Sequence, residues 1–200
     1  MTSPKEQELL ALVEQQGILR ARQLADHGIA RVYLQRLMDK GELERIGRGL
    51  YRNPQAEVSL HHSLAAAAQR TPEAVVCLLS ALAFHELTTQ LPHAVWLALP
   101  PGRAAPQPDY PPIQVIHVSG RAFQAGVEEH PIEGVAVPIY GVAKTVADCF
   151  KFRNRIGVDV AVESLRQCLA ERRCTVDELL HYAAICRMTK VMRPYMEALL

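Results

Sequence analysis

The chain has 200 residues, of which 49% are hydrophobic, and its 22 lysines and arginines nearly balance its 21 aspartates and glutamates. This composition excludes a disordered chain and a strongly basic one, and it suits one globular domain or two small ones. No apolar run approaches the roughly 18 residues that a membrane helix needs. The start, MTSPKEQELL, also lacks a basic segment followed by a long apolar one. The sequence therefore predicts a cytoplasmic protein without a membrane partner.

The cysteines favour a reduced protein without a structural metal. They are odd in number and form no C-x-x-C pair, and most lie in apolar or helical contexts: Cys77, Cys149, Cys168, Cys174 and Cys186. Reduced thiols within the core are therefore favoured over disulfides or zinc ligands. No P-loop or dinucleotide fingerprint occurs, so we expect neither a metal nor another cofactor.

The first residues predict two helices. Apolar residues recur at helical spacing over residues 4–16, and Gly17 can supply the left-handed conformation that ends a helix. Residues 20–28, RARQLADHG, are predicted to form a second, shorter helix with Leu24 inward and Gly28 as its end.

A third helix and a hairpin follow. Residues 31–41 carry their apolar side chains on one stripe and their polar ones on another. In LERIGRGLYR, Gly47 and Arg48 are predicted to form the two-residue turn of a tight hairpin, because glycine permits the backbone of such a turn. Three helices and a hairpin indicate a winged helix-turn-helix over residues 1–54.

Residues 59–200 alternate between helical and strand patterns. SLHHSLAAAAQR predicts a helix, AVVCLLS a buried strand, ALAFHELTT a helix and AVWLALP another buried strand. After a proline-rich loop over 99–112, IQVIHVS and VEEHPIEGVAVPIYG predict further strands, with a turn near Glu133 and Gly134. Three last helices are predicted in KTVADCFKFRNRIG, DVAVESLRQCLAERR and TVDELLHYAAICR. The expected fold class is therefore α+β: a winged helix-turn-helix, then a mixed α/β domain with C-terminal helices.

Positive charge gathers on the N-terminal domain. Residues 18–52 contain eight basic and four acidic residues, whereas the whole chain has a net charge of only +1. Such a surface is what phosphate binding requires, because each neutralised phosphate releases condensed counterions. The candidate DNA-binding residues lie on the predicted second helix, the third helix and the hairpin: Arg20, Arg22, Arg31, Tyr33, Gln35, Arg36, Arg45 and Arg48.

These residues have different expected roles. The third helix would enter the major groove, where arginine recognises guanine edges and glutamine recognises adenine edges. The hairpin arginines would hold the adjacent backbone or minor groove, and those at the start of the second helix suit phosphate contacts. Tyr33 lies four residues before Leu37, so a core-facing orientation is an alternative. A solvated face without a partner, or a winged helix that binds a protein, also stays open.

Catalytic patterns are poor by comparison, so no catalytic residue is predicted. HELTT begins like the zinc-protease motif H-E-x-x-H, but Thr89 stands where the second histidine is needed. His61 and His62 are adjacent and point in different directions on a helix. Asp148 and Lys151 suit a degenerate nuclease-like pair less well than an ordinary ion pair between residues three apart.

Three stretches in order resemble one family. LMDKGELERIGRGLYR, LLSALAFHELTTQLPHAVWLALP and IYGVAKTVADCFKFRNRIGVDVAVESL together make the chain similar to the AbiEi family, the antitoxins of type IV toxin–antitoxin systems in bacterial abortive infection, a form of phage defence. The resemblance implies a winged helix that binds operator repeats and represses its own operon. It assigns DNA contacts to Arg31, Gln35 and Arg36 on the third helix and to Arg45 and Arg48 on the wing.

The same resemblance implies a second activity. In the family, the C-terminal domain, here residues 59–200, supports antitoxin action against a toxin that resembles a nucleotidyltransferase, without requiring a stable complex. The candidate antitoxin surface is a second basic cluster, Lys151, Arg153 and Arg155. The alternatives are a stand-alone winged-helix regulator or protein-interaction module without a toxin and, less well supported, a degenerate nuclease.

Overall fold

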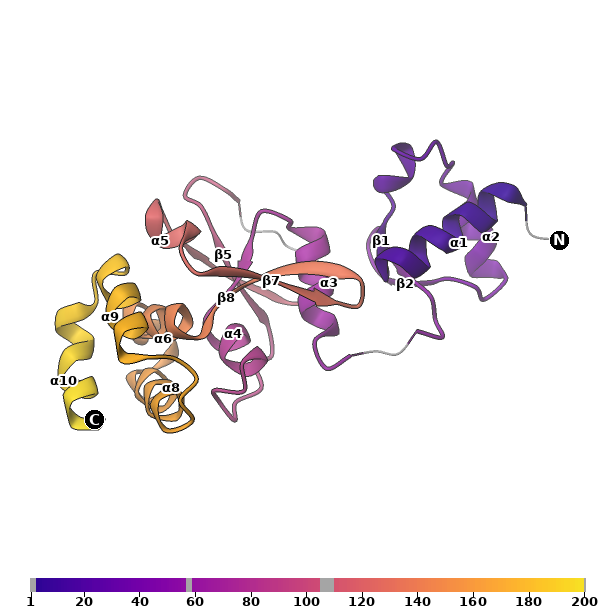
Figure 1. Ribbon diagram of the computed structural model, residues 1–200. Helices are drawn as coiled ribbons and strands as arrows, with labels where there is room; N and C mark the ends of the chain where they lie inside the picture. Colours follow the sequence, from indigo (N-terminus) through magenta and orange to yellow (C-terminus); the bar gives the residue numbers. More distant parts are fainter. Residues whose placement is uncertain (1–2, 57–58, 105–109, 200) are drawn as a thin grey trace. The chain divides into compact units, whose positions relative to one another are not determined.

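The computed structural model describes residues 3–56, 59–104 and 110–199 (Figure 1). The chain divides into two compact units. The first comprises Met1–Pro72, Pro106–Pro112 and His130–Val137; the second comprises Glu73–Ala105, Ile113–Glu129 and Pro138–Leu200. The functional boundary expected between residues 54 and 59 stays a prediction. Among the described helices, none combines the length and the apolar character needed to cross a membrane.

The first unit contains the winged helix-turn-helix. Its elements are α1 (Pro4–Gln16), β1 (Ile18–Arg20), the 3-10 turn η1 (Gln23–Ala25), α2 (Val32–Asp39), β2 (Glu44–Gly47), β3 (Leu50–Arg52) and α3 (His62–Arg70). The strands form an antiparallel sheet in the order β1-β3-β2. Its core consists of buried side chains from the helices and the sheet: Leu9, Val13, Leu19, Leu24, Ile29, Leu34, Leu37, Leu43 and Tyr51.

The predicted second helix over 20–28 is wrong. The chain first forms β1, which pairs with β3, and the side chain of Gln23 then accepts a hydrogen bond from the backbone N–H of Arg20 at 2.7 Å. This local bond ends the strand in a 3-10 turn, because side-chain bonds to the backbone compete with regular structure.

The hairpin turn lies one residue later than predicted. Arg48 and Gly49 connect β2 to β3, and Gly49 has φ +73, a conformation that favours glycine. The register shifts between Arg45 and Gly47, so one strand contains an irregularity beside the turn. The wing is thus a hairpin with an arginine at its tip.

A five-stranded sheet has the strand order β6-β5-β4-β8-β7. Most of it lies in the second unit, whereas the end of β7, the start of β8 and the turn between them belong to the first. The strands and the short helices between them are β4 (Val75–Val76), α4 (Leu78–Phe84), β5 (Val95–Leu99), β6 (Ile113–His117), α5 (Arg121–Gln124), β7 (Val127–Ile132) and β8 (Val135–Tyr140). Strand β4 pairs antiparallel with β5 and parallel with β8, and β5 pairs parallel with β6. The predicted turn at Glu133 and Gly134 joins β7 to β8.

Five helices follow the sheet: α6 (Val142–Lys151), α7 (Arg153–Ile156), α8 (Val158–Ala170), α9 (Val176–Ile185) and α10 (Thr189–Leu199). Helix α6 contacts α4, α8, α9 and α10, and its side chains are buried over Ala143–Phe150. Figure 1 shows α8, α9 and α10 gathered around it. Helix α6 is therefore the centre of this unit.

One prediction for the second unit is wrong, and its last helix was missed. AVVCLLS contains a strand of only two residues before helix α4 begins at Leu78, because an apolar run without a clear period does not distinguish a buried strand from a buried helix. Helix α10 was not predicted, since Pro194 weakens its helical signal. Its buried residues Met192 and Met196 nevertheless repeat at helical spacing.

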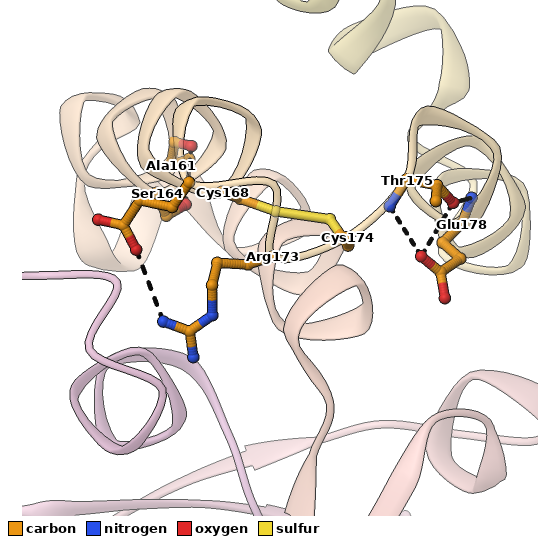
Figure 2. The surroundings of a disulfide bond; sticks show 8 residues. Ala161, Ser164, Cys168, Arg173, Cys174, Thr175 and Glu178 are labelled. Atoms are coloured by element: carbon orange, nitrogen blue, oxygen red, sulfur yellow. Dashed lines mark hydrogen bonds and ion pairs between the residues drawn. A yellow bond between two sulfur atoms is a disulfide. The ribbon is translucent and has the colours of Figure 1, made fainter.

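The cysteines also differ from expectation. Cys168 and Cys174 form a disulfide, whereas Cys77, Cys149 and Cys186 are free and buried. Figure 2 shows the pair beside the start of α9, where Thr175 and Glu178 form a capping box. Between the two cysteines, Arg172 has φ +53, and the Cα atoms of Cys168 and Cys174 lie 6.4 Å apart. Sequence spacing alone did not reveal this local reversal of the chain.

Candidate nucleic-acid interface

Helix α2 is held against α1 by a buried carboxylate. Glu6, only 4% exposed, accepts hydrogen bonds from the backbone N–H of Ser3 at 2.6 Å and from Lys40 Nζ at 3.1 Å. The bond from Ser3 and then that from Lys40 hold the pKa of Glu6 below its ordinary value. The ionised carboxylate thus connects the start of α1 to the end of α2 and fixes their relative position.

The two faces of α2 have different compositions. Leu34 and Leu37 are buried in the core of the first unit. The remaining exposed positions of the helix form the outward face: Val32, Gln35, Arg36 and Asp39. Gln35 Nε2 donates to Asp39 Oδ1 at 2.8 Å, which fixes the glutamine amide on this face. Packing of the leucines therefore determines which side chains α2 presents to a partner.

A single groove gathers most of the predicted DNA-binding residues. It has a volume of about 420 Å³ and lies among β1, η1, α2 and the wing. Six of the predicted residues line it: Arg20, Arg22, Arg31, Gln35, Arg45 and Arg48. The other lining residues are Ala21, Leu34, Met38, Gly49 and Tyr51, so no described lining residue is acidic. We call this surface the basic groove.

The arginines of the basic groove are available to a ligand to different degrees. Arg22, Arg31 and Arg48 are exposed, and their side chains make no hydrogen bond or ion pair to any described residue. Arg45 is also exposed, and its Nε donates to the carbonyl oxygen of Gly47 at 3.1 Å, which fixes it along the wing. Arg20 is half-buried. The groove therefore combines one arginine fixed along the wing with three exposed arginines whose side chains have no partner among the described residues.

Two predicted residues lie outside the basic groove. Tyr33 packs against the core of the first unit, which is the alternative orientation considered for it. The guanidinium carbon of Arg36 lies 5.3 Å from the centre of the Tyr33 ring. Arg36 is exposed on the outward face of α2. Charge patterning also missed the apolar part of the lining, Leu34, Met38 and Tyr51, because it counts only ionised residues.

The second basic cluster is largely engaged within its own unit. Arg153 donates to the carbonyl oxygen of Phe150 at 2.8 Å, and Arg155 donates to that of Val115 at 3.3 Å. Lys151 Nζ lies 5.9 Å from the Phe152 ring centre. These contacts hold the end of α6 and the neighbouring sheet. The role of Lys151, Arg153 and Arg155 as an antitoxin surface stays a prediction.

The ion pair expected between Asp148 and Lys151 from their spacing does not form. Asp148 forms an ion pair with Lys144, one helical turn earlier, and both side chains are fully buried. Cys186 Sγ lies 3.2 Å from Asp148 Oδ1, and Lys144 Nζ lies 3.9 Å from the Tyr140 ring centre. Burial raises the pKa of Asp148, against the opposing effect of Lys144. A carboxylate enclosed in this way does not reach a substrate.

A partly buried pair contains one of the histidines. His62 Nδ1 lies 2.6 Å from Glu133 Oε2, and the backbone N–H of Ser59 donates to Glu133 Oε1 at 2.8 Å. Burial acts to raise the pKa of Glu133, but the bonds from His62 and Ser59 outweigh it and leave the pKa below its ordinary value. Within the described residues, His, Cys, Asp and Glu form no group of three able to hold a metal ion.

Comparisons with known proteins concern the N-terminal family and the overall fold. Residues 7–54 match the family model described as "Transcriptional regulator, AbiEi antitoxin", which confirms the resemblance for the N-terminal region. The fold is similar to the crystal structure of the Rv2827c protein from Mycobacterium tuberculosis, with a TM-score of 0.58 and 14% identity over 92% of this chain and 72% of that chain. At this identity the likeness concerns the fold alone. No curated protein matches the sequence.

Proposed function

We propose that this protein, whose residues 7–54 match the model of the AbiEi antitoxin transcriptional regulators, binds operator repeats in duplex DNA and represses its own operon. The observation that carries the proposal is the basic groove. Five arginines and Gln35 line one concave surface that includes the recognition helix α2 and the wing. A winged helix that presents such a surface suits the phosphate backbone of DNA.

The groove supports a division of roles between its residues. Arg31 and Gln35 lie near the start of α2, where a recognition helix contacts base edges. Arg45 and Arg48 lie on the wing, and Arg20 and Arg22 lie beside η1, positions suited to phosphate contacts. Base contacts select the site, whereas phosphate contacts supply affinity that depends on salt.

The proposal has a second part that concerns the toxin. We assign antitoxin action to residues 59–200, against a toxin that resembles a nucleotidyltransferase and without a stable complex between the two proteins. The support is the resemblance of the AVWLALP and KTVADCF regions to the family. Growth of cells that carry the neighbouring toxin gene, with and without the full chain, tests this part directly.

Duplex DNA from the region upstream of the coding sequence tests the repressor part. Fluorescence anisotropy over a range of NaCl concentrations should show affinity that falls steeply with salt, because bound arginines displace counterions. Reversing Arg22, Arg31 and Arg48 together to Glu should abolish binding.

The matched control reverses three exposed arginines of the second unit, Arg121, Arg166 and Arg172, and so changes the net charge equally. This control should retain most of the affinity. If the two triple variants lose affinity equally, or if salt has no effect on the wild type, the basic groove is not the DNA-binding surface.

A further inference from the structure

The outward face of α2 contains one apolar side chain that the core does not explain. Val32 is 51% exposed at the first position of the helix, whereas the leucines of the same helix are 3% exposed or less. It belongs neither to the buried core of the first unit nor to the side chains that pack against that core. As a β-branched residue it also disfavours the helix slightly relative to alanine. Neither packing nor helix propensity therefore accounts for it.

The neighbours of Val32 are the residues expected to read DNA. Successive helical residues are rotated by about 100°, so Val32 shares a face with residues three and four positions later. Those residues are Gln35 and Arg36, and both are exposed. Arg31 lies immediately before Val32 and lines the basic groove. An apolar group thus stands among three side chains that can make polar contacts to bases.

We propose that Val32 is a specificity-determining residue that packs against the 5-methyl group of a thymine in the major groove. This inference rests on the proposed function and adds the base that α2 recognises. Thymine is the base whose major-groove edge carries a methyl group, and side-chain apolar atoms recognise it by contact. A half-exposed valine near the start of a recognition helix has the position and the chemistry for that contact.

Gln35 gives the contact a polar neighbour. One N–H of its amide donates to Asp39 Oδ1 at 2.8 Å, which leaves the amide oxygen and the second N–H for a ligand. These are the two groups that a glutamine uses to recognise the N6 and N7 positions of adenine. Val32 and Gln35, one turn apart on the helix, therefore favour a step that contains an A·T base pair.

The test removes the methyl group from DNA without changing base pairing. The full-length wild-type protein first selects duplexes from a random pool, and these give its preferred site. Each thymine of that site is then replaced in turn by uracil. At one thymine in each operator repeat, we expect the replacement by uracil to weaken binding about fourfold, the effect of one methyl group. The Val32→Ala variant should bind thymine and uracil at that position equally, and Val32→Thr, which keeps one γ-methyl group, should retain part of the preference.

Val158→Ala is the matched control, because Val158 is also the first residue of a helix and is 45% exposed. It should preserve the preference for thymine. Site-selective binding that uracil leaves unchanged at every position would overturn the inference while leaving the proposed function intact. So would a Val32→Ala protein that still distinguishes the two bases. Failure to bind any duplex in a salt-dependent way would instead overturn the proposed function, and the inference with it.

Discussion

The basic groove and the centre of α6 use charged residues in opposite ways. In the groove, Arg22, Arg31 and Arg48 are exposed and have no side-chain partner among the described residues. In α6, Lys144 and Asp148 are fully buried and paired with each other. The difference separates recognition from folding: exposed charges can exchange water for phosphate, whereas buried charges depend on their internal partner. Changes at the two places should therefore affect different measurements.

The largest effect is expected at the buried pair. Lys144→Met leaves the Asp148 carboxylate without its counter-charge in the core, and breaking such a pair costs roughly 3–5 kcal/mol of unfolding free energy. Urea denaturation followed by circular dichroism measures this loss. The control is Lys151→Met, which removes a half-exposed lysine from the same helix and should change stability by less than about 1 kcal/mol.

The double variant Lys144→Met with Asp148→Leu sharpens the test. Replacing both members of a buried pair by apolar residues is often neutral, so the double variant should recover much of the stability lost in the single one. A double variant as unstable as the sum of both single variants would show that shape, rather than charge pairing, determines stability at this site.

Intermediate effects are expected in the basic groove, on DNA binding rather than on stability. Arg31→Ala or Gln35→Ala should cost about 1–3 kcal/mol, mainly on the preferred sequence. Arg48→Ala should weaken binding to all sequences and lower the salt slope by about one unit. Anisotropy with preferred and random duplexes measures both quantities. Equal losses on every sequence for all three variants would remove the distinction between base and phosphate contacts.

The smallest effect is expected at Glu133. Its pair with His62 is partly buried, between the exposed arginines of the basic groove and the fully buried pair in α6. Because the pKa of Glu133 is lowered in the folded state, the stabilisation is present above the unfolded pKa of about 4.3 and is lost as the pH falls through the folded value. Glu133→Gln should cost on the order of 1 kcal/mol at pH 7, the scale of a screened charged hydrogen bond. The variant should also show a flatter loss of stability between pH 5 and pH 3, measured by urea denaturation.

Glu129→Gln provides the comparison, since Glu129 is exposed on strand β7 of the same hairpin. It should behave like the wild type over the same pH range. If both glutamine variants follow one curve, the bond between Glu133 and His62 adds nothing measurable to stability.

Sequence patterns predicted the elements whose signal is local. Gly17 marked the end of α1, and Glu133 with Gly134 marked the turn between β7 and β8. The glycines of the wing placed its turn to within one residue. The failures share a physical cause. Strand β1 exists because β3 pairs with it. Helix α4 is apolar on most of its faces, so its sequence shows no helical periodicity of apolar and polar residues. In both cases tertiary contacts decide the structure, and the local sequence does not contain them.

Charge and helical spacing were enough to predict most of the residues that line the candidate site. Six of the eight predicted residues line the basic groove, because arginines placed around one helix and its wing converge when the core orients that helix. Tyr33 is amphipathic, so its orientation depended on the packing around it. The pairing of Asp148 with Lys144 was missed because the two charges close to it, Lys144 and Lys151, lie at equally plausible helical spacings and only burial distinguishes them.

The short strand β4 has a consequence for the order in which the chain is completed during synthesis. Its Val76 pairs with Ile139 of β8, so the middle of the five-stranded sheet cannot close until the ribosome has produced both β7 and β8. The sheet of the winged helix-turn-helix closes once Arg52 has emerged, since all three of its strands precede that point. Pairings distant in sequence form slowly, whereas local ones form quickly. A nascent chain therefore assembles the secondary structure around its basic groove while the second unit is still being translated.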